Sequence, residues 1–540
     1  MGINLKLVNK EKRQMKSKSK KQLIFLGVLV AFMLWGAVLL TPVLADSRPD
    51  FVVAVQKNPV TMEPMDNNSN VHMRILWNVG ETLIRVDYKH NQKLIPGLAT
   101  EWKRLDGSTL ELKLRKGVKF HNGEEFTAED VAFSFGPQRL FHEKIGLFAK
   151  MYLGNIEVPE VVDRYTVRIR SKTPDFLLEK RLANYMSEIV SKKAFLAAKD
   201  YATWSRNPVL TGPYKVVELK TAVFIKLAAF DDYWGKKAPA KTITFKVVPE
   251  VAGRVAGLKT GEYQIITELP PDQLKSVDEN KGTSAVGGPI GNVRSVNFDT
   301  TNPILKSPEL RRAMAMAIDR QLIVDSLYHG RTSVPNGFQM KLFGDMWIED
   351  HPGVPYNQDK ARELIKKSGY KGETIYYRLL SNYYTLQVAT AQILVEMWKA
   401  VGLNVKIDMK ENWNQILKND DTRHIVDLSN TAFYLDPVGM TWRRLGPTFW
   451  GRKENKYDGK EPMLVLPEEF DKLGKILETS TDLQTRRKAV RRMLEIADFE
   501  EPALISLHAM TMFYGKRDEV NWTVYPAEYM DLTAANLSFK

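Results

Sequence analysis

The sequence predicts an α/β fold with a large buried core. The chain has 540 residues, and at roughly 150 residues per domain this length suffices for several domains. Short apolar strand patterns alternate along the chain with helices that begin at capping residues. After Ser381 a loop, a helix over 386–400 and a strand over 405–409 follow one another, an order that is typical of an α/β domain.

Residues 106–135 predict a strand meander that leads into a helix. Asp106-Gly107 is a turn signal, and over 110–114 leucines alternate with polar residues, so we expect one face of a strand to be buried. Thr127 and Asp130 form a capping box that begins the helix. No residue of this segment has the chemistry of an active site, and we expect the segment to serve packing.

The same signals predict further elements. Strands are expected over 51–55, 263–267 and 293–298. Helices are expected over 254–261, ended by Gly261, over 307–320, with Ser307 as N-cap and Pro308 at the first helical position, and over 356–370, closed by Gly369. A passage rich in proline and glycine over 269–291 is expected to break the strand pattern.

The first 45 residues have the three parts of a secretory signal peptide. Basic residues precede an apolar run over 23–40, and Val43-Leu44-Ala45 is a small-residue cleavage site. We therefore expect cleavage after Ala45, which the helix-breaking Pro42 also favours. The apolar run is long enough to span a membrane, so an uncleaved anchor is the alternative.

Much of the positive charge belongs to this leader. Residues 1–45 hold eight Lys or Arg and one Glu, a net of +7, which is half of the total of +14. The rest of the chain is moderately basic, which keeps a protein soluble or favours an anionic ligand. No basic run is interleaved with aromatic residues, so no nucleic-acid partner is expected.

Cysteine is absent from the whole sequence. This absence excludes disulfides, thiolate metal sites, thiol nucleophiles and a lipid-bearing cysteine after the leader. A freely diffusing monomer in the periplasm of a Gram-negative cell is the simplest outcome. The eight histidines are scattered, so no metal site is expected. Motifs of serine hydrolases, phosphate-binding loops, zinc peptidases and dinucleotide enzymes are missing as well, so we expect neither an enzyme nor a cofactor.

The order of residues over 106–135 closely resembles the signature segment of the extracytoplasmic solute-binding proteins of family 5, the oligopeptide, dipeptide and nickel class that serves ABC importers. Other segments resemble this family in the same order over nearly the whole chain after position 45. They include Pro-Gly-Leu-Ala at 96–99, Thr-Gly-Pro-Tyr at 211–214 and Phe-Asp-Asp-Tyr-Trp-Gly at 230–235.

The resemblance implies a two-lobe periplasmic-binding-protein fold of type II, cluster C like, with an enlarged first lobe and a hinge between the lobes. The expected domains are the signal peptide at 1–45, lobe I with an extra subdomain at 46–297, lobe II at 298–505 and a return to lobe I at 506–540. Two crossings between the lobes are the architecture of hinge-closing binding proteins.

The resemblance also implies a function. The expected protein captures a small peptide or peptide-like ligand between its lobes in the periplasm and delivers it to an inner-membrane ABC permease with its ATPase. Ligand contacts made by both lobes exist only in the closed state, so binding favours closure. The alternatives are a binder of a non-peptide anion, such as an opine-like or sugar-phosphate conjugate, a membrane-anchored sensor, and an enzyme or chaperone with this fold.

Four places are expected to supply the ligand contacts. A ligand held between lobes favours Trp and Tyr, which close over it with few rotamers to freeze. The first place is the loop after the first strand, with Asn67, Asn68 and Ser69. The second is Thr211 with Gly212, and the third precedes a helix and holds Asn382, Tyr383 and Tyr384. Trp413 is expected to form a further wall of the cleft. Each has a structural alternative, as a turn cluster, as core packing or as an exposed loop.

The fourth place, over 431–445, is the most informative. It resembles the segment in which peptide binders of the family carry an aspartate that binds the amino terminus of the peptide. When the two segments are aligned on Asp436-Pro437, the position of that aspartate is held by Phe433 in this chain. Asp436 is either a substitute or a turn former. Trp442 offers a flat surface on which a ligand can stack. The guanidinium groups of the adjacent Arg443 and Arg444 suit an anionic group of the ligand. The alternative is that both arginines lie on the surface and pair with nearby acidic residues.

Overall fold

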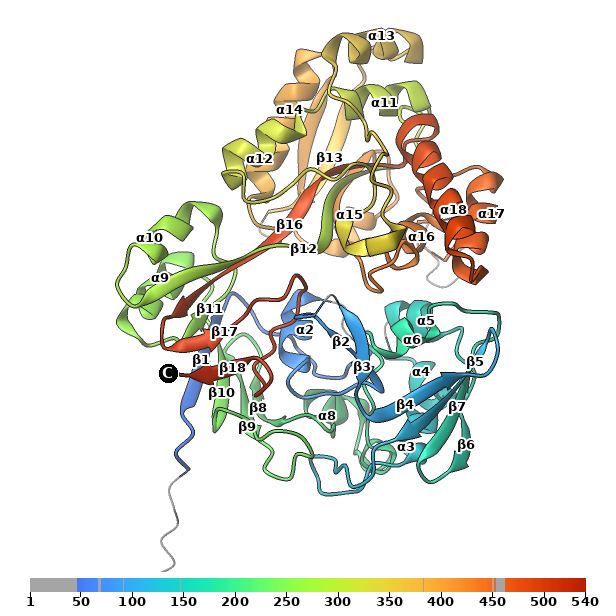
Figure 1. Ribbon diagram of the computed structural model, residues 1–540. Coiled ribbons are helices and arrows are strands. Elements are labelled where there is room, and N and C mark those ends of the chain that lie inside the picture. Colours follow the sequence, from blue (N-terminus) through green and yellow to red (C-terminus); the bar gives the residue numbers. More distant parts are fainter. Residues whose placement is uncertain are drawn as a thin grey trace, which may run out of the picture. The chain divides into compact units, whose positions relative to one another are not determined.

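The structure of the protein is a computed structural model, and Figure 1 labels its helices and strands. It describes residues 46–66, 69–90, 92–145, 147–381, 383–448, 451–452 and 462–540. The signal peptide expected over 1–45 lies outside the described residues. Within the ranges just given, the search for a helix both long enough and apolar enough to cross a membrane finds none.

The first half of the chain alternates short strands with short helices. Its strands are β1 (Asp50–Val55), β2 (Ile84–Asp87), β3 (Lys93–Pro96), β4 (Ala99–Arg104), β5 (Thr109–Leu114), β6 (Glu160–Asp163), β7 (Thr166–Arg170), β8 (Tyr214–Lys220), β9 (Phe224–Ala229), β10 (Thr242–Val247) and β11 (Ile265–Ile266). Its helices are α2 (Asn70–Leu76), α3 (Ala128–Ser134), α4 (Pro137–Leu140), α5 (Leu147–Leu153), α6 (Leu178–Leu182), α7 (Lys192–Ala197), α8 (Tyr201–Arg206), α9 (Val251–Thr260), η1 (Pro271–Gln273) and α10 (Leu274–Asp278).

Two long strands, β12 (Thr283–Phe298) and β16 (Leu504–Arg517), enclose the next part of the chain. Between them are the strands β13 (Ile375–Leu380), β14 (Val405–Lys410) and β15 (Ile425–Thr431). The helices there are α11 (Pro308–Met316), α12 (Arg320–Tyr328), η2 (Lys341–Met346), α13 (Gln358–Ser368), α14 (Gln387–Ala400), α15 (Trp413–Leu417), η3 (Pro437–Gly439), α16 (Thr441–Leu445), α17 (Glu468–Thr479), α18 (Leu483–Glu495) and η4 (Ile496–Glu500). The C-terminal segment after β16 holds β17 (Val520–Trp522) and β18 (Leu537–Phe539).

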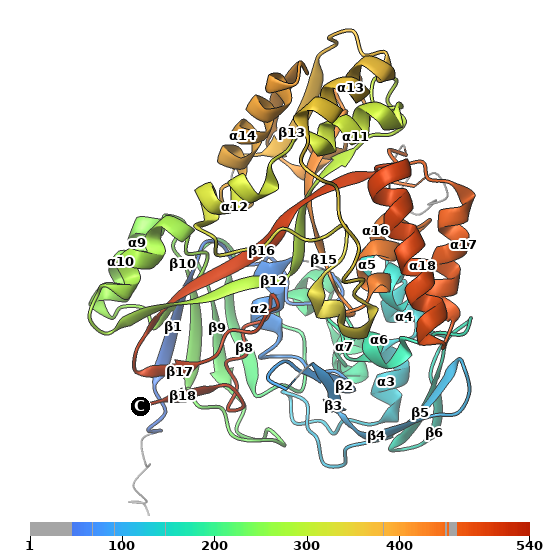
Figure 2. The same ribbon diagram turned by 45° about the horizontal axis from the view of Figure 1, so that its top comes forward.

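One ten-stranded sheet joins these parts, in the order β14-β13-β15-β12-β16-β11-β1-β10-β9-β8. We call the elements before β12 the first half and the elements between β12 and β16 the second half. The strands β12 and β16 pair with each other along most of their length, while β15 of the second half pairs with β12 and β11 of the first half pairs with β16. The two long strands therefore connect the halves, as Figure 2 shows.

Several expectations from the sequence are confirmed. The strand over 51–55 is β1, whose parallel pairing with β10 and β11 explains its nearly continuous apolar sequence. At the start of α3 the backbone N–H of Thr127 donates to Asp130 Oδ2 at 2.9 Å, as a capping box requires. The glycines Gly261 and Gly369, which follow α9 and α13, have φ values of 85° and 76°, which other residues rarely adopt.

The expectation of one helix over 307–320 is wrong in its extent. Ser307 caps α11 as expected, but that helix ends at Met316 and a second helix, α12, begins at Arg320. The reason is a second N-cap, because the side chain of Asp319 accepts a hydrogen bond from the backbone N–H of Leu322.

The break expected over 269–291 is present up to Gly282, where η1 and α10 lie, but is wrong from Thr283 on, because β12 begins there and continues through the later proline and glycine positions. Pairing with β16 holds this part extended. Gly287 has a φ of 110°, and a Cβ there would lie 2.1 Å from the backbone oxygen of Met512, so the close approach of the two strands requires glycine. The register shifts between Pro289 and Val293.

A buried ion pair joins β12 to β15 of the second half. Arg294 donates through Nε to Asp427 Oδ1 at 2.6 Å and through Nη2 to Asp427 Oδ2. Gln387 donates to the same carboxylate at 2.7 Å. Both charged side chains are at most 2% exposed. Each of these buried charges is stabilised by its partner in place of water. Loss of either partner therefore leaves the other charge buried and uncompensated.

We predict that Arg294→Met destabilises the protein by about 3–5 kcal/mol, because it leaves the Asp427 carboxylate buried without its cation. The free energy of unfolding, measured by urea denaturation, is the readout. The double variant Arg294→Met/Asp427→Leu should recover most of this loss. Arg491→Met, which breaks the exposed pair with Asp350, is the control and should leave the stability nearly unchanged. An Arg294→Met protein as stable as the control would contradict this prediction.

Candidate functional site

A small cavity lies where the two halves and the C-terminal segment meet. Met73 and Tyr88 line it from the first half, Gly291 from β12, and residues within 431–435 and 526–529 from the second half and the C-terminal segment. Its volume is about 20 Å³, which is room for a group of the size of a water molecule. A ligand group at this place contacts both halves at once.

The carboxylate of Glu528 lines this cavity. Its Oε1 accepts hydrogen bonds from Asn292 Nδ2 at 2.9 Å and from Thr431 Oγ1 at 3.1 Å. The side chain is only 7% exposed. Burial raises the pKa of Glu528 above its ordinary value, although both hydrogen bonds and the charge of Arg443 oppose the shift.

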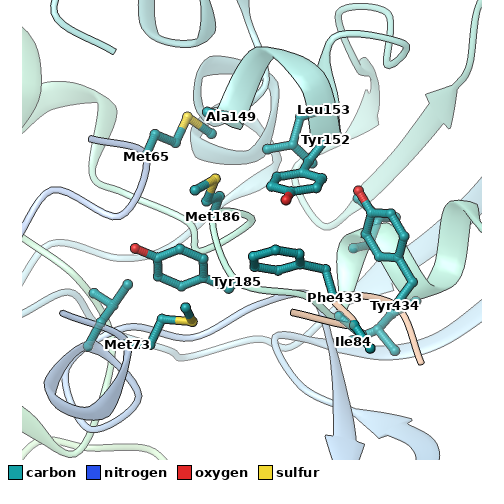
Figure 3. Packing of buried hydrophobic residues seen from close by; sticks show 14 of the residues in the cluster. Met65, Met73, Ile84, Ala149, Tyr152, Leu153, Tyr185, Met186, Phe433 and Tyr434 are labelled. Carbon is teal, nitrogen blue, oxygen red and sulfur yellow. The ribbon is translucent and has the colours of Figure 1, made fainter. Parts of the chain in front are cut away.

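The ring of Phe433 forms an apolar border of the cavity. Its centroid lies 4.7 Å from that of Tyr152, a residue of the first half. In Figure 3 the ring lies between Tyr185 and Tyr434, with Met186 close by. Phe433 therefore contributes an apolar contact between the halves and no charge.

Arg443 and Arg444 lie in different surroundings although they are adjacent. The guanidinium of Arg443 lies 5.0 Å from the ring centroid of Phe433, and its charge acts on the Glu528 carboxyl. Arg444 is buried and donates to Asn297 Oδ1 of β12 at 2.6 Å, and burial lowers its pKa. Arg443 is thus the arginine of the pair that lies near the cavity, while Arg444 packs inside the second half.

Asp436 and Trp442 do not line the cavity, and Asp436 lies 3.9 Å from the ammonium of Lys180 of the first half. Asp436 caps the turn η3 and forms an ion pair with Arg486 at 2.8 Å. The indole of Trp442 lies against Gly474, where a Cβ would come within 2.1 Å of the ring. Its Nε1 donates to Glu478 Oε2 at 3.4 Å.

The aromatic residues at the start of α14 divide into two groups. The ring of Tyr384 lies 4.0 Å from the guanidinium of Arg294 and belongs to the interior of the second half. Tyr383 packs edge-on against Trp413 at 5.0 Å, and the ammonium of Lys57 lies 4.9 Å from its centroid. Because Lys57 comes from the first half, Tyr383 and Trp413 lie where the halves meet.

The remaining expected residues support the first half. Ser69 is the N-cap of α2 and accepts a hydrogen bond from the backbone N–H of His72. Thr211 is fully buried, and Gly212 lies so close to Val79 that a Cβ would come within 2.5 Å of its carbonyl group. None of these three lines the cavity. The expected ligand contacts Asn67, Asn68 and Asn382 lie outside the described residues.

Arg181 connects the two halves away from the cavity. Within the first half its Nε donates to Asp175 Oδ2 at 2.6 Å. Across to the second half its Nη1 donates to the hydroxyl of Tyr434 and its Nη2 to Glu478 Oε1, both at 3.1 Å. These contacts exist only while the halves are close together.

No sequence motif marks Asn292 and Glu528, which are 236 residues apart. The one local sign is a single charge within the apolar and aromatic run over 524–530. Across the ranges that the structure describes, no group of three or more His, Asp or Glu side chains could hold a metal ion.

Comparisons with known proteins agree with this architecture. The model of the family "Bacterial extracellular solute-binding proteins, family 5 Middle" matches residues 93–452. The dipeptide-binding protein of Escherichia coli strain K12 is 26% identical, over 79% of this chain and 83% of its own. The glutathione-binding protein GsiB of Pectobacterium atrosepticum is 29% identical, over 70% of this chain and 72% of its own.

The fold agrees with that of a solved relative. The crystal structure of a dipeptide-binding protein from Pseudoalteromonas sp. SM9913 in complex with Met-Leu superposes with a TM-score of 0.80 at 22% identity, and the match covers 91% of this chain and 100% of that one. The expected α/β fold with two lobes, of the type II periplasmic-binding-protein class, is thereby confirmed. Because the family model spans most of the chain, the protein belongs to family 5 of the bacterial extracellular solute-binding proteins.

Proposed function

We propose that the protein is the periplasmic substrate-binding component of an ABC importer, and that it binds a peptide or peptide-like solute between its two halves. It then delivers this solute to an inner-membrane permease with its ATPase. The observation that carries the proposal is the cavity to which both halves and the C-terminal segment contribute. The names of two relatives, a dipeptide-binding and a glutathione-binding protein, support a peptide-like solute.

The charges beside the cavity suit a zwitterion. Arg443 offers a guanidinium, which complements a carboxylate, and Glu528 offers a carboxyl group, which complements an amine. A free peptide carries both charges at its ends. The two side chains come from α16 and from the C-terminal segment, so a peptide bound to both draws separate parts of the chain together.

Entry of a peptide requires the halves to separate, because a cavity of about 20 Å³ holds no peptide. We propose that the hinge lies in β12 and β16, near the register shift between Pro289 and Val293. The lobes expected from the sequence, 46–297 with 506–540 and 298–505, have their boundaries a few residues from this hinge on both strands. Contacts that cross between the halves favour the closed state once the ligand is bound.

Export and the absence of catalysis are part of the same proposal. The leader over 1–45 directs the chain to the periplasm and is removed after Ala45. The relatives are named for the solutes they bind. We expect this protein, as a monomer, to release its solute chemically unchanged.

A non-peptide anion is the second candidate ligand. Two points favour it. The pairing on Asp436-Pro437 expected from the sequence puts Phe433 at the aspartate position of the family's peptide binders, and the guanidinium of Arg443 lies beside the ring of Phe433. Such a solute needs Arg443 but no amine partner. An opine-like or sugar-phosphate conjugate has this chemistry.

We predict that isothermal titration calorimetry with a pool of unmodified dipeptides and tripeptides detects binding to the mature protein. Native mass spectrometry of the protein from its own periplasm should show a retained solute with the mass of a short peptide. A retained solute without peptide bonds, together with no heat from the peptide pool, would reject the peptide and leave the anion candidate.

We predict that Arg443→Gln weakens binding of the peptide pool about 10- to 100-fold, because a charge-assisted hydrogen bond contributes roughly 1.5–3 kcal/mol. Arg491→Gln, a change at an exposed arginine paired with Asp350, is the matched control. An affinity of Arg443→Gln equal to that of the control would remove Arg443 from the ligand site.

We predict that Glu478→Gln lowers the affinity for the same pool by about fivefold or less, because the partly exposed pair with Arg181 stabilises the closed state by ~1 kcal/mol or less. Glu469→Gln changes an exposed carboxylate on the same helix and should leave the affinity unchanged. Radius of gyration from small-angle X-ray scattering, with and without the peptide pool, reports closure. An unaltered affinity would mean that this pair does not favour the closed state.

A further inference from the structure

We propose that Glu528 and Asn292 form the subsite for a cationic nitrogen of the solute, in place of the aspartate position that Phe433 occupies. This inference rests on the proposed function and identifies which residues take the amino terminus of the peptide. Two buried acceptor atoms at this place receive no hydrogen bond from the described residues.

The first of these atoms is Glu528 Oε2. The other oxygen of this carboxylate accepts from Asn292 and Thr431, but Oε2 is buried and receives no hydrogen bond within the described ranges of the chain. A buried carboxylate oxygen without a donor costs free energy, so the group either keeps a proton or meets a ligand donor.

The second atom is Asn292 Oδ1, on a side chain that is 4% exposed. It too is buried and lacks a donor among the residues that the structure describes. The orientation of this amide follows from its neighbour, because a carboxylate oxygen only accepts and the contact with Glu528 must come from the amide NH₂. Oδ1 is therefore the end of the amide that remains for another donor.

Asn292 and Glu528 are joined by one hydrogen bond and each keeps one acceptor atom without a donor. Two such acceptors call for a group that carries several N–H donors. A primary ammonium has three such donors and a full charge, whereas a carboxylate or phosphate has none. The cavity volume of about 20 Å³ fits a group of this size. The aromatic residues Tyr88 and Tyr529 also line the cavity, and aromatic surroundings favour a cation.

The nearby arginines do not already satisfy Glu528. Arg74 is engaged by Glu268, to which its Nη2 donates. Arg443 acts on Glu528 through its charge, but no ion pair joins the two among the described residues. Burial raises the pKa of Glu528 above its ordinary value, and a cation beside the carboxylate would stabilise its charged form.

The position of this subsite explains how the chain can lack a carboxylate at position 433. Thr431, which donates to Glu528, is two residues before Phe433 on the same segment, and both residues line the same cavity. The negative charge for an amine thus comes from the C-terminal segment, while position 433 serves the apolar contact with Tyr152.

The test uses the mature protein and two probes, a pool of dipeptides and tripeptides with free amino termini and the same pool N-acetylated. Acetylation removes the charge and two donors while keeping the rest of each peptide. We expect the wild-type protein to bind the free pool about 10- to 100-fold more tightly than the acetylated pool. In Glu528→Gln this preference should disappear, because affinity for the free pool falls and affinity for the acetylated pool does not.

Glu519→Gln, which changes an exposed carboxylate of the same C-terminal region, is the matched control and should keep the wild-type preference. The thermal midpoint of each variant checks that it is folded. If Glu528→Gln fails to fold, the affinities of the wild-type protein for the free and the acetylated pool decide whether a subsite for a free amino terminus exists. Equal binding of both pools by the wild type would overturn the subsite and leave peptide binding intact. Binding of neither pool would reject the proposed peptide function, and the subsite for the peptide's amine with it.

Discussion

The antiparallel pairing of β12 with β16 is the constraint on which the rest of the structure depends. These strands are more than 200 residues apart in the chain, and their pairing encloses the second half as an insertion between them. Their outer neighbours, β15 and β11, belong to different halves, so the same ladder carries both parts of the sheet. The close approach at Gly287 and the register shift after Pro289 lie within this ladder. Motion of one half relative to the other must therefore be absorbed by these two strands.

The way charges are buried separates structural sites from the candidate ligand site. Arg294 with Asp427, and Arg486 with Asp436, are buried ion pairs in which each charge has its partner. Glu528 differs, because its only hydrogen bonds among the described residues come from neutral groups. Burial of a carboxylate without a paired cation is unfavourable. A group with this cost is expected where a ligand supplies the missing charge.

The apolar contact of Phe433 with Tyr152 joins the second half to the first half beside the cavity. In a site where an aspartate met the ligand, this contact between the halves would be absent, since a carboxylate among Tyr152, Tyr185 and Met186 would be desolvated. The aromatic ring stabilises the approach of the halves with no ligand charge involved. The guanidinium of Arg443 lies 5.0 Å from the centroid of this ring, and the Glu528 carboxyl lines the cavity beside it.

Local patterns in the sequence predicted β1, the capping box of α3 and the glycine ends of α9 and α13, because each depends on residues close together in the chain. The order of motifs likewise predicted the two-lobe fold and the family. The extent of β12 and the end of α11 escaped prediction, since pairing with β16 and a second cap at Asp319 overrode the local signals. The distinction between Arg443 and Arg444 and the meeting of Asn292 with Glu528 were decided only by tertiary structure, because burial and contacts over 236 residues leave no periodic pattern in the sequence.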